Sequence, residues 1–566
     1  MPADEEVGGA ETLTVADLVA WLDRFDELCS TNVSWLTELD SAIGDADLGT
    51  NLTRGTSALR TTLHDDAPAD AGDLLHRCGM TLLATVGGAS GALFGSMFRA
   101  MGKRAGETAQ LNVGGLASAF EAGLASVVTL GRAEVGDKTM VDAIAPGVAE
   151  LTARAARGEQ LEQTLRGAAR AAVAGRDSTL PLVARKGRAS YLGERSAGHL
   201  DPGAAAASLL FEALTVHTTL THHHTTALTG APMSTIRRQF VNRPDDVIAE
   251  ALDGLQRTYP SLLAFDAAAN VVSRAVPASG KVGLVSGGGS GHEPLHAGFV
   301  GTGMLDAAVC GAVFASPTSE QVQAGTRLAD SGAGVVHIVK NYTGDVLNFE
   351  IAAELVSDDG IAMEAVIVDD DLASHGAHDG PGRRGTAAVV TVEKVLGALA
   401  EQGADLAAVA AAGRDVVGRS RSLALALDAC THPGESRAAF ELAADEVEFG
   451  VGIHGERGTG RIPFATADEL VEQLVTPLAE SLELRRGQSV IAIVNGLGGA
   501  YPLELSIIAR QVHRLLNDRG VSVARSLVGS YVTSLDMHGA SVTFTVADDD
   551  LVRLWDAPVR TPNLTW

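Results

Sequence analysis

The sequence predicts a multidomain protein in which an all-α helical bundle is followed by an α/β region of two lobes. Up to about residue 219, alanine and leucine recur at helical spacing. Residues 218–232 form a threonine-rich stretch that ends in Gly230-Ala-Pro232, a composition typical of linkers. From about residue 233, short β-branched runs alternate with helical stretches, as in α/β layers. We therefore expect domains at residues 1–217 and 233–566.

Composition limits the classes of function. Of 566 residues, 46% are hydrophobic and 20% are charged, as in globular proteins. The formal net charge of −27 would repel a phosphate backbone or an anionic lipid surface, so we expect no nucleic-acid partner. The N-terminus lacks the features of a signal peptide, and no run of about 18 apolar residues could span a bilayer, so we expect a cytoplasmic protein without a membrane partner. Four cysteines without the spacing of metal ligands are expected to be buried apolar residues: Cys29, Cys78, Cys310 and Cys430.

The helical region shows apolar residues at helical spacing from Val15 to Phe25 and again from Leu161 to Val173. Glycine clusters interrupt this pattern, and we interpret them as loops between helices: Gly87–Gly91, Gly136–Thr139 and Gly187–Gly203. If these loops share one end of the bundle, they form a pocket.

The stretch Asp40–Asn51 gathers three carboxylates and two glycines around one sharp turn. Mg²⁺ prefers oxygen ligands, often carboxylates together with substrate phosphates, and glycine lets a backbone approach those phosphates closely. Asp and Asn are also favoured at helix starts, so a capped helix is the alternative interpretation. The motif by itself leaves both open.

The α/β region follows a linker whose histidines, His222–His224, we interpret as solvated rather than metal-bound. Strands are expected at Val282–Ser286, Gly334–Lys340, Ala365–Asp369, Val490–Val494 and Val542–Val546. Their alternation with helices predicts a largely parallel sheet. A change of pattern near residues 455–485 indicates two lobes.

Polar residues gather where these strands end. Gly287–Pro294, which contains His292, directly follows the first strand, and Lys340 and Asp345 end the next one. Ligands of parallel sheets bind beyond the carboxyl ends of strands, so both ends can serve one site for a small polar substrate. His454 is a third candidate because glycines flank it closely. A tight turn with a capping histidine, or a core histidine, remains the alternative for each imidazole.

These motifs resemble the dihydroxyacetone kinase family. In the α/β region, the stretches similar to the family's substrate-binding subunit are Gly287–Gly298, Lys340–Glu350, Asp369–Asp371, Gly382–Gly385, Gly450–Glu456, Ser534–Met537 and Trp555–Val559. In the helical region, those similar to its nucleotide-binding domain are Gly44–Asn51, Gly87–Gly91, Gly136–Met140 and Gly187–Ser196. The resemblance covers nearly the whole chain and points to the ATP-dependent single-chain kinases of the family.

The resemblance implies that the helical region binds ATP and two Mg²⁺ ions, with Asp40, Asp45 and Asp47 as metal ligands. The residues that it places around ATP are Leu48, Gly49, Thr50, Asn51, Ser90, Gly91, Gly131, Thr139, Met140, Arg188, Asp201, Pro202 and Gly203.

In the α/β region, the resemblance implies that His454 bonds covalently to the ketone carbon of the substrate as a hemiaminal, which would select ketoses over polyols. His292 and Asp345 would be acid/base partners for the primary hydroxyl that attacks the γ-phosphate. Positioning and charge neutralisation would supply most of the catalysis. The residues that it places around the ketose are Gly289, Ser290, Gly291, His292, Lys340 and Asp345.

The chain departs from the family pattern in three places. Leu48 replaces the usual histidine, which removes a polar contact near the phosphates. The nucleotide domain comes first, so transfer between the chains of a homodimer becomes an expectation. The segment Leu372–Pro381 carries smaller side chains than the family's bulky Asp-Ser-Leu-Tyr-like loop. If it borders the substrate, erythrulose competes with dihydroxyacetone as the substrate.

Two other functions stay open from the resemblance. Relatives of both domains act as non-catalytic regulators through protein contacts, although this chain keeps its three aspartates, both histidines and Asp345. Some relatives act as lyases that form cyclic FMN from FAD, an activity that would use the helical region.

Overall fold

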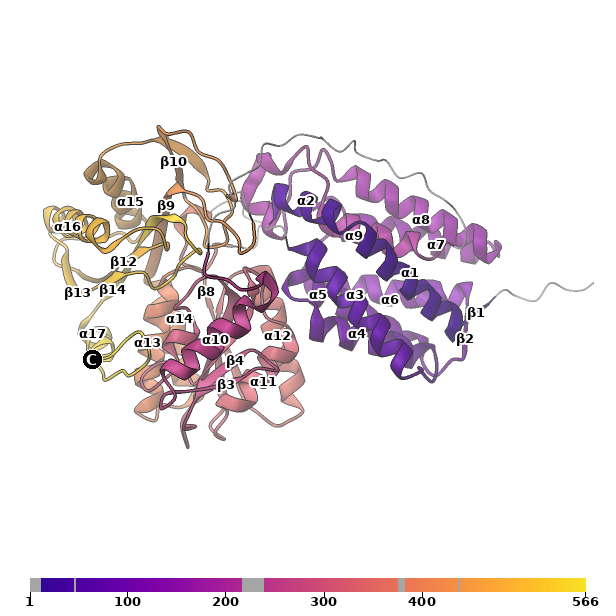
Figure 1. Cartoon of the computed structure of the whole chain (residues 1–566), viewed down its shortest axis with the longest axis horizontal. Helices are drawn as coiled ribbons and strands as arrows, with labels where there is room; N and C mark the ends of the chain where they lie inside the picture. The colour runs from indigo at the N-terminus through magenta and orange to yellow at the C-terminus, as the bar shows by residue number, and fades with distance from the viewer. Residues whose placement is uncertain (1–11, 45–46, 216–238, 375–381, 436–437) are drawn as a thin grey trace, which may run out of the picture. The chain divides into compact units, whose positions relative to one another are not determined.

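The structure is a computed structural model that describes residues 12–44, 47–215, 239–374, 382–435 and 438–566. The chain divides into two compact units: the described residues up to 215, apart from residues 87–89, belong to the first, and those from 239 onward belong to the second (Figure 1). The expected linker and its three histidines lie outside the described residues. The predicted domain limits therefore stay predictions.

The first unit is a helical bundle, which confirms the all-α prediction. Its helices are α1 (Val15–Thr31), α2 (Val33–Ile43), α3 (Leu48–Asp65), α4 (Ala71–Thr85), α5 (Gly88–Ala105), α6 (Val113–Gly131), α7 (Val141–Ala156), α8 (Leu161–Ser178) and α9 (Pro202–Glu212). A 3-10 helix, η1 (Arg188–Ser196), precedes α9. Two short strands, β1 (Thr12–Thr14) and β2 (Gln110–Asn112), pair antiparallel.

The apolar face of each helix turns into one shared core. Phe25, Phe98 and Phe120 are fully buried, and the Phe120 ring lies 5.0 Å from that of Phe211 between ring centroids. This core orders the helices side by side, as Figure 1 shows for the indigo to purple half of the chain. Glycine cluster Gly87–Gly91 is mostly the first turn of α5 rather than a loop, because α5 begins at Gly88.

One described helix, α6, has the length and mean hydropathy that a membrane crossing would need. Core helices of bundles pass the same test, and Leu116, Phe120 and Val127 of α6 belong to the bundle core.

The second unit begins with the 3-10 helix η2 (Pro244–Asp246) and helix α10 (Val247–Thr258) and contains two six-stranded sheets. The first sheet has the order β3-β4-β6-β5-β7-β8. Its strands are β3 (Leu263–Asp266), β4 (Val271–Arg274), β5 (Gly283–Ser290), β6 (Ala307–Val313), β7 (Val335–Lys340) and β8 (Met363–Val368). The pairs β5–β6, β5–β7 and β7–β8 are parallel, whereas β3–β4 and β4–β6 are antiparallel.

Helices cover both faces of this sheet, which explains why its central strands are apolar throughout. Val285, Val335 and Val339 pack with α11 (Ser319–Ala329) and α12 (Thr343–Ser357). The alternate residues Leu284, Val336 and Ile338 face the opposite cluster, which includes α13 (Ala388–Glu401) and α14 (Leu406–Gly418). Short 3-10 helices η3 (Ala297–Phe299) and η4 (Leu372–Ser374) follow β5 and β8.

The second sheet has the order β11-β10-β9-β14-β12-β13. Its strands are β9 (Ser420–Asp428), β10 (Glu446–Phe449), β11 (Gly460–Pro463), β12 (Ser489–Gly496), β13 (Ser522–Gly529) and β14 (His538–Ala547). Helices α15 (Ala467–Ser481) and α16 (Pro502–Asp518) contribute to the apolar cluster on one face, and α17 (Asp549–Trp555) follows β14.

The structure confirms each of the five predicted strands but corrects two details of the α/β region. The second sheet is mainly antiparallel, since only β12 and β13 pair in parallel, so the prediction of a largely parallel sheet is wrong there. The second sheet also begins at Ser420, ahead of the predicted change at residues 455–485. The strand β9 reads Ser-Arg-Ser-Leu-Ala-Leu-Ala-Leu-Asp, without β-branched residues, so its strand character comes from pairing with β14 rather than from propensity.

Candidate active site

Gly287, Gly288 and Gly289 lie within β5 rather than after it as predicted, because the strand runs on through Ser290. They allow other groups to approach the strand. A Cβ at Gly288, which has φ of 153°, would lie 2.4 Å from Lys340 Nζ, and one at Gly291, with φ of 100°, would lie 2.7 Å from the Phe314 ring. The glycine run therefore serves close packing of a lysine and an aromatic ring against the strand end.

Lys340 and Asp345 meet at the carboxyl end of β7, where α12 begins. Lys340 is fully buried and Asp345 is 1% exposed. Their Nζ and Oδ2 atoms lie 3.6 Å apart, and the Asp345 Oδ1 atom is buried without a hydrogen-bond partner among the described residues. Buried carboxylate oxygens are rarely left without a donor, so Oδ1 is suited to accept a hydrogen bond from a ligand hydroxyl.

Two imidazoles lie beside each other in the same unit. The ring centroids of His292 and His454 are 4.7 Å apart, and their planes are nearly perpendicular at 84°. Phe314 stacks on His292 at 5.0 Å, and Tyr342 meets His454 edge-on at 4.4 Å. His292 is 1% exposed and His454 is 4% exposed. The structure thus brings together two histidines that are 162 positions apart in the sequence.

Both lobes hold His292 in place. The His292 Nδ1 atom lies 2.8 Å from the carbonyl oxygen of Thr533, and the Thr533 N–H donates to the His292 carbonyl at 3.2 Å. The Leu535 N–H donates to the Gly291 carbonyl at 2.7 Å, and the Phe314 N–H donates to that of Ser290 at 2.8 Å. The predicted substrate-binding residues of this loop are therefore fixed by backbone bonds from the second lobe and from the end of β6.

Arg384 anchors the segment that carries His454. Its guanidinium donates to Asp371 Oδ2 at 2.7 Å, to the Gly450 carbonyl at 2.9 Å and to Glu456 at 3.1 Å. The Glu456 carboxylate in turn accepts the His454 backbone N–H. Arg384 is 2% exposed, so water does not compete for the hydrogen bonds by which its planar guanidinium holds the loop.

Two buried residues without a predicted role adjoin this site. His296 Nε2 lies 2.9 Å from Lys340 Nζ, and His296 Nδ1 lies 2.6 Å from Glu393 Oε1 on α13. Burial raises the pKa of Glu393 to about 8, and burial together with the Lys340 ammonium holds the pKa of His296 well below its usual value. His296 belongs to a motif that was recognised, but nothing in the sequence singles out Glu393 within an apolar helix.

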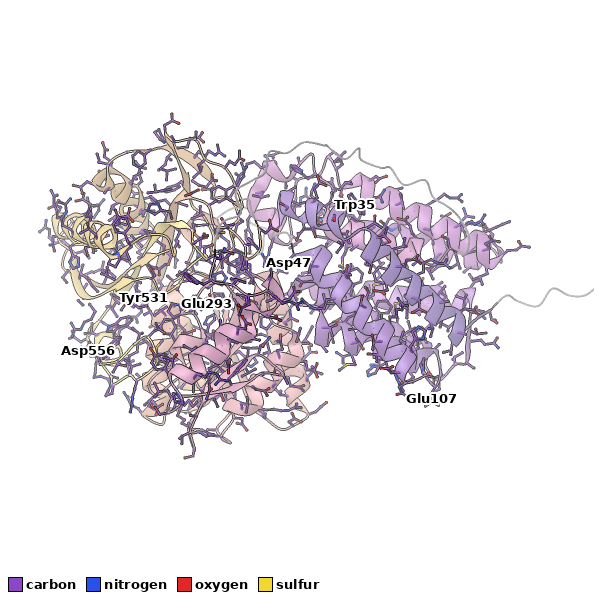
Figure 2. The ribbon with its side chains drawn as sticks, in the orientation of Figure 1. Trp35, Asp47, Glu107, Glu293, Tyr531 and Asp556 are labelled. Carbon is purple, nitrogen blue, oxygen red and sulfur yellow. The ribbon has the colours of Figure 1, made fainter. Side chains whose placement is uncertain are left out.

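The second group of predicted residues lies in the helical unit, at the turn between α2 and α3. Asp40 is 6% exposed, and its Oδ2 atom accepts the backbone N–H groups of Asp47 at 2.8 Å and Leu48 at 3.1 Å. Asp47, at the start of α3 (Figure 2), accepts the Asn51 side-chain amide at 2.7 Å. Asp45 lies outside the described residues. The helix start is thus capped by Asp40, which supports the capping interpretation for this carboxylate, and the Asp40 Oδ1 and Asp47 carboxylates have the chemistry that Mg²⁺ prefers.

Several residues expected around ATP have a packing role in the bundle. Leu48 is buried in the bundle core. A Cβ at Gly49 would lie 2.4 Å from Thr37 Oγ1, and one at Gly91 would lie 1.8 Å from the Val86 carbonyl oxygen. These two glycines are required for close packing of α3 on α2 and for the tight turn into α5.

The loop before α7 is shaped by buried charges. Asp142 accepts the Gly136 N–H at 2.6 Å and the Thr139 N–H at 2.7 Å. Lys138, which could have served as a phosphate ligand, is 1% exposed. It donates to three carbonyl oxygens, those of Thr179 at 2.8 Å, Leu182 at 3.1 Å and His199 at 2.5 Å. Lys138 therefore holds these loops together. The loop before α7 can offer backbone groups to a phosphate, but not the Lys138 ammonium.

Asp201 caps α9 by accepting the Ala204 N–H at 2.6 Å. Burial raises its pKa to about 7, and the Asp142 carboxylate adds to this shift. A Cβ at Gly203 would lie 3.5 Å from Met140 N, so the starts of α7 and α9 are neighbours.

Three contacts join helix ends near residues that are expected around ATP. Arg54 Nε donates to the Thr85 carbonyl at 3.2 Å, which joins α3 to the turn before α5. Gly131, at the end of α6, would bring a Cβ 3.5 Å from Leu93 of α5. Ile43 at the end of α2 packs with Ala189 of η1. These helix ends carry Thr50, Asn51, Ser90, Gly91 and Arg188. Thr139, Met140, Pro202 and Gly203 lie at the neighbouring starts of α7 and α9.

In the described parts of the chain, no three His, Cys, Asp or Glu side chains are grouped so as to hold a metal ion. The predicted Mg²⁺ ligand set includes Asp45, which is outside those parts. The four cysteines are all free and buried, as the sequence predicted.

The chain matches two known families, one in each of its two units. A family described as the Dak1 domain matches residues 253–563, and one described as the DAK2 domain matches residues 42–216.

Curated relatives and a solved structure agree with these matches. The dihydroxyacetone-binding subunit DhaK of the PTS-dependent dihydroxyacetone kinase 1 of Listeria innocua is 45% identical over 313 residues, which are 55% of this chain and 95% of that protein. The triokinase/FMN cyclase of Homo sapiens is 46% identical over 285 residues, 49% of this chain and 49% of that protein. The crystal structure of the dihydroxyacetone kinase from C. freundii in complex with AMP-PNP and Mg²⁺ matches 58% of this chain and 61% of that chain, at 35% identity and a TM-score of 0.54.

Proposed function

The chain belongs to the Dak1 domain family and carries a DAK2 domain ahead of it, and from this membership and the site geometry we propose that it is an ATP-dependent kinase of a short-chain ketose. The observation that carries the proposal is the pairing of Lys340 with Asp345, whose Oδ1 atom is buried without a partner among the described residues. The His292 and His454 imidazoles lie side by side in the same unit. Together these groups can fix a small hydroxyketone and take a proton from its hydroxyl.

We propose that His454 captures the ketone carbon. A bond forms between an imidazole nitrogen and that carbon, the π electrons of the carbonyl move to its oxygen, and the imidazole proton ends on that oxygen as a hemiaminal hydroxyl. An alcohol offers no such carbon, so this step selects ketoses. Support comes from the Arg384–Glu456 anchor, which fixes the segment on which His454 lies.

Asp345 is then the base for the hydroxyl that attacks the γ-phosphate, with His292 as its acid/base partner. The Lys340 ammonium lies 3.6 Å from Asp345 Oδ2 and helps to hold this carboxylate in place. Gly289, Ser290 and Gly291 supply the wall against which the ketose is oriented. Phosphoryl transfer depends mainly on such positioning.

The helical unit is proposed to bind ATP with two Mg²⁺ ions at Asp40, Asp45 and Asp47. Carboxylate oxygens at a turn fit this metal, and bound Mg²⁺ would neutralise phosphate charge. Helix starts favour anions, and the starts of α7 and α9, which carry residues expected around ATP, are neighbours. Related support is the C. freundii kinase structure, which contains AMP-PNP and Mg²⁺.

The substrate is proposed to be erythrulose or dihydroxyacetone. The segment that motivates erythrulose, residues 372–381, begins in η4, and its residues 375–381 lie outside the described residues. We also propose that the protein is cytoplasmic, since ATP is the phosphoryl donor and the buried cysteines are free. We propose that it acts as a homodimer, because the nucleotide domain comes first and transfer between chains would join the two sites.

A second candidate activity is formation of cyclic FMN from FAD by the helical unit. The human relative, which matches over about half of its own length, is a triokinase/FMN cyclase. Incubation with FAD and Mn²⁺, followed by chromatography for cyclic FMN, tests this activity separately from the kinase.

The kinase proposal is tested by initial rates of ADP formation with ATP, Mg²⁺ and each of four acceptors: dihydroxyacetone, D-erythrulose, L-erythrulose and glyceraldehyde. Acceptor-dependent ADP formation with a ketose, and its loss in Asp345→Asn, is the expected result. The matched control is Asp330→Asn, which changes the same chemical group at the end of α11, where the aspartate is half-buried. Equal rates with and without every acceptor would contradict the proposal.

A further inference from the structure

Lys340 is held from three directions. Its Nζ atom lies 2.9 Å from the Gly287 carbonyl oxygen, 2.9 Å from His296 Nε2 and 3.6 Å from Asp345 Oδ2. The ammonium donates to the Gly287 carbonyl and to His296 Nε2, and Asp345 Oδ2 lies within ion-pair distance. The side chain is fully buried, and its position depends on these contacts.

The contact with His296 fixes the tautomer of that imidazole. An ammonium can only donate, so His296 Nε2 accepts and the ring proton resides on Nδ1. The Nδ1–H then donates to Glu393 Oε1, 2.6 Å away. His296 is 4% exposed and Glu393 is fully buried, so no solvent competes for these bonds. The result is a hydrogen-bond relay in which Lys340 donates to His296 and His296 donates to Glu393.

We propose that His296 and Glu393 are positioning residues of the ketose site, which hold the Lys340 ammonium against Asp345 through this relay. The inference rests on the proposed kinase function. In this relay Glu393 accepts a hydrogen bond from the neutral imidazole of His296. It is not the counter-ion of Lys340, so Asp345 is the carboxylate that pairs with the Lys340 ammonium.

The burial of Glu393 agrees with this role. Its pKa is raised to about 8, so the carboxyl group keeps its proton over most of the neutral range and presents a neutral oxygen to His296. Three other titratable groups belong to this surrounding. Asp345 comes from α12, His292 adds to the lowering of the His296 pKa, and Glu293, which follows β5, acts on Cys310, on which Lys340 acts as well. Asp345 is the nearest carboxylate to Lys340 in the described structure.

Two substitutions of Glu393 separate the roles. Glu393→Gln keeps the shape of the side chain and one oxygen acceptor. Because His296 accepts from Lys340 and donates through Nδ1–H, the amide must turn its oxygen toward His296. Glu393→Leu keeps the bulk but removes the acceptor. Glu401→Gln is the matched control, because Glu401 lies on the same helix and pairs with Arg274 instead.

The measurement is kcat and KM for dihydroxyacetone phosphorylation from pH 6 to 9.5, with thermal unfolding of each full-length variant. We expect Glu393→Leu to lower kcat by about tenfold to a hundredfold with an unchanged KM for ATP, because a small displacement of a positioning group costs this much. Glu393→Gln should stay within about threefold of wild type at pH 7. Wild type and Glu401→Gln should lose activity above about pH 8 as Glu393 ionises, whereas Glu393→Gln should keep it.

Folded Glu393→Leu with wild-type kcat and KM would overturn the relay. Loss of activity in Glu393→Gln equal to that in Glu393→Leu would assign Glu393 as a counter-ion and overturn the proposal as well. The relay has a readout that needs no turnover: ¹⁵N NMR of histidine-labelled protein, assigned with His296→Gln, should show His296 as the Nδ1–H tautomer in wild type and Glu393→Gln. If wild type shows the Nε2–H tautomer, the relay is contradicted even when the kinase is active. If wild type shows the Nδ1–H tautomer but has no turnover, only the kinase proposal is contradicted.

Discussion

The two units build their candidate sites from different groups. In the α/β unit, long buried side chains from separate elements contact one another, as in Lys340, His296 and Glu393. In the helical unit, the short carboxylates of Asp40 and Asp201 accept the backbone N–H groups at the starts of helices. The first arrangement fixes its geometry through side-chain bonds, whereas the second fixes carboxylates through backbone donors. Substitutions should therefore affect ketose handling through position and nucleotide handling through charge.

The largest effect is expected for the aspartates of the helical turn. Asp47→Asn or Asp45→Asn should lower kcat by about a thousandfold or more, because each removes a negative ligand from the proposed Mg²⁺ site. Ketose capture by the other unit should stay intact. Titration of the rate with Mg²⁺ measures the effect, and Asp65→Asn at the far, exposed end of α3 is the control. Wild-type turnover in either variant would remove that residue from the site.

His454→Ala is expected to abolish covalent capture of the ketose and to lower kcat/KM by about a hundredfold, because the substrate loses its fixed position. Nucleotide binding by the helical unit should not change. Mass spectrometry of the protein after mild reduction with ketose present detects the adduct. The control is His513→Ala on α16, whose imidazole contacts Ser526. An adduct on the His454→Ala chain would identify a different nucleophile.

Arg384→Lys should raise KM for the ketose by about tenfold. Lysine keeps the charge but cannot reach Asp371, Gly450 and Glu456 at once, so the segment that holds His454 loses its support. Arg414→Lys is the control, because Arg414 lies in an exposed ion pair with Glu364 on the same unit. Steady-state kinetics with both substrates varied separates the ketose KM from that for ATP. An unchanged ketose KM would show that the loop is held without Arg384.

The smallest effect is expected on the pH dependence of stability through Asp201. Its pKa is raised from 3.8 to about 7 by burial, so the folded state binds more protons than the unfolded state between these values. The free energy of unfolding should therefore fall as pH rises from about 4 to 7, by at most a few kcal/mol. Asp201→Asn should lack this slope. Hydrogen exchange of α9 in the full chain at pH 5 and pH 7 measures it, and equal slopes in both proteins would contradict the shift.

Much of the site was accessible from sequence because its residues cluster in short motifs. Gly287–His292 and Lys340–Asp345 lie at strand ends, where parallel sheets place ligands. The pairing of His292 with His454 could not be derived from spacing, since it depends on the second lobe. Glu393 was missed because it lies on an otherwise apolar helix, where a carboxylate gives no pattern.

The sequence by itself determined the order of an all-α unit and an α/β unit, since helical spacing and β-branched runs are local properties of the chain. It also carried the motifs by which the family is recognised. Only the tertiary structure decided the antiparallel pairing of the second sheet, the strand character of β9 and the packing roles of Gly49 and Gly91. It likewise decided that Lys138 is buried as a tie between loops and that Glu393 adjoins Lys340 through His296. These features depend on contacts between residues far apart in the chain, and local propensity does not encode which distant partner a strand or a buried charge will meet.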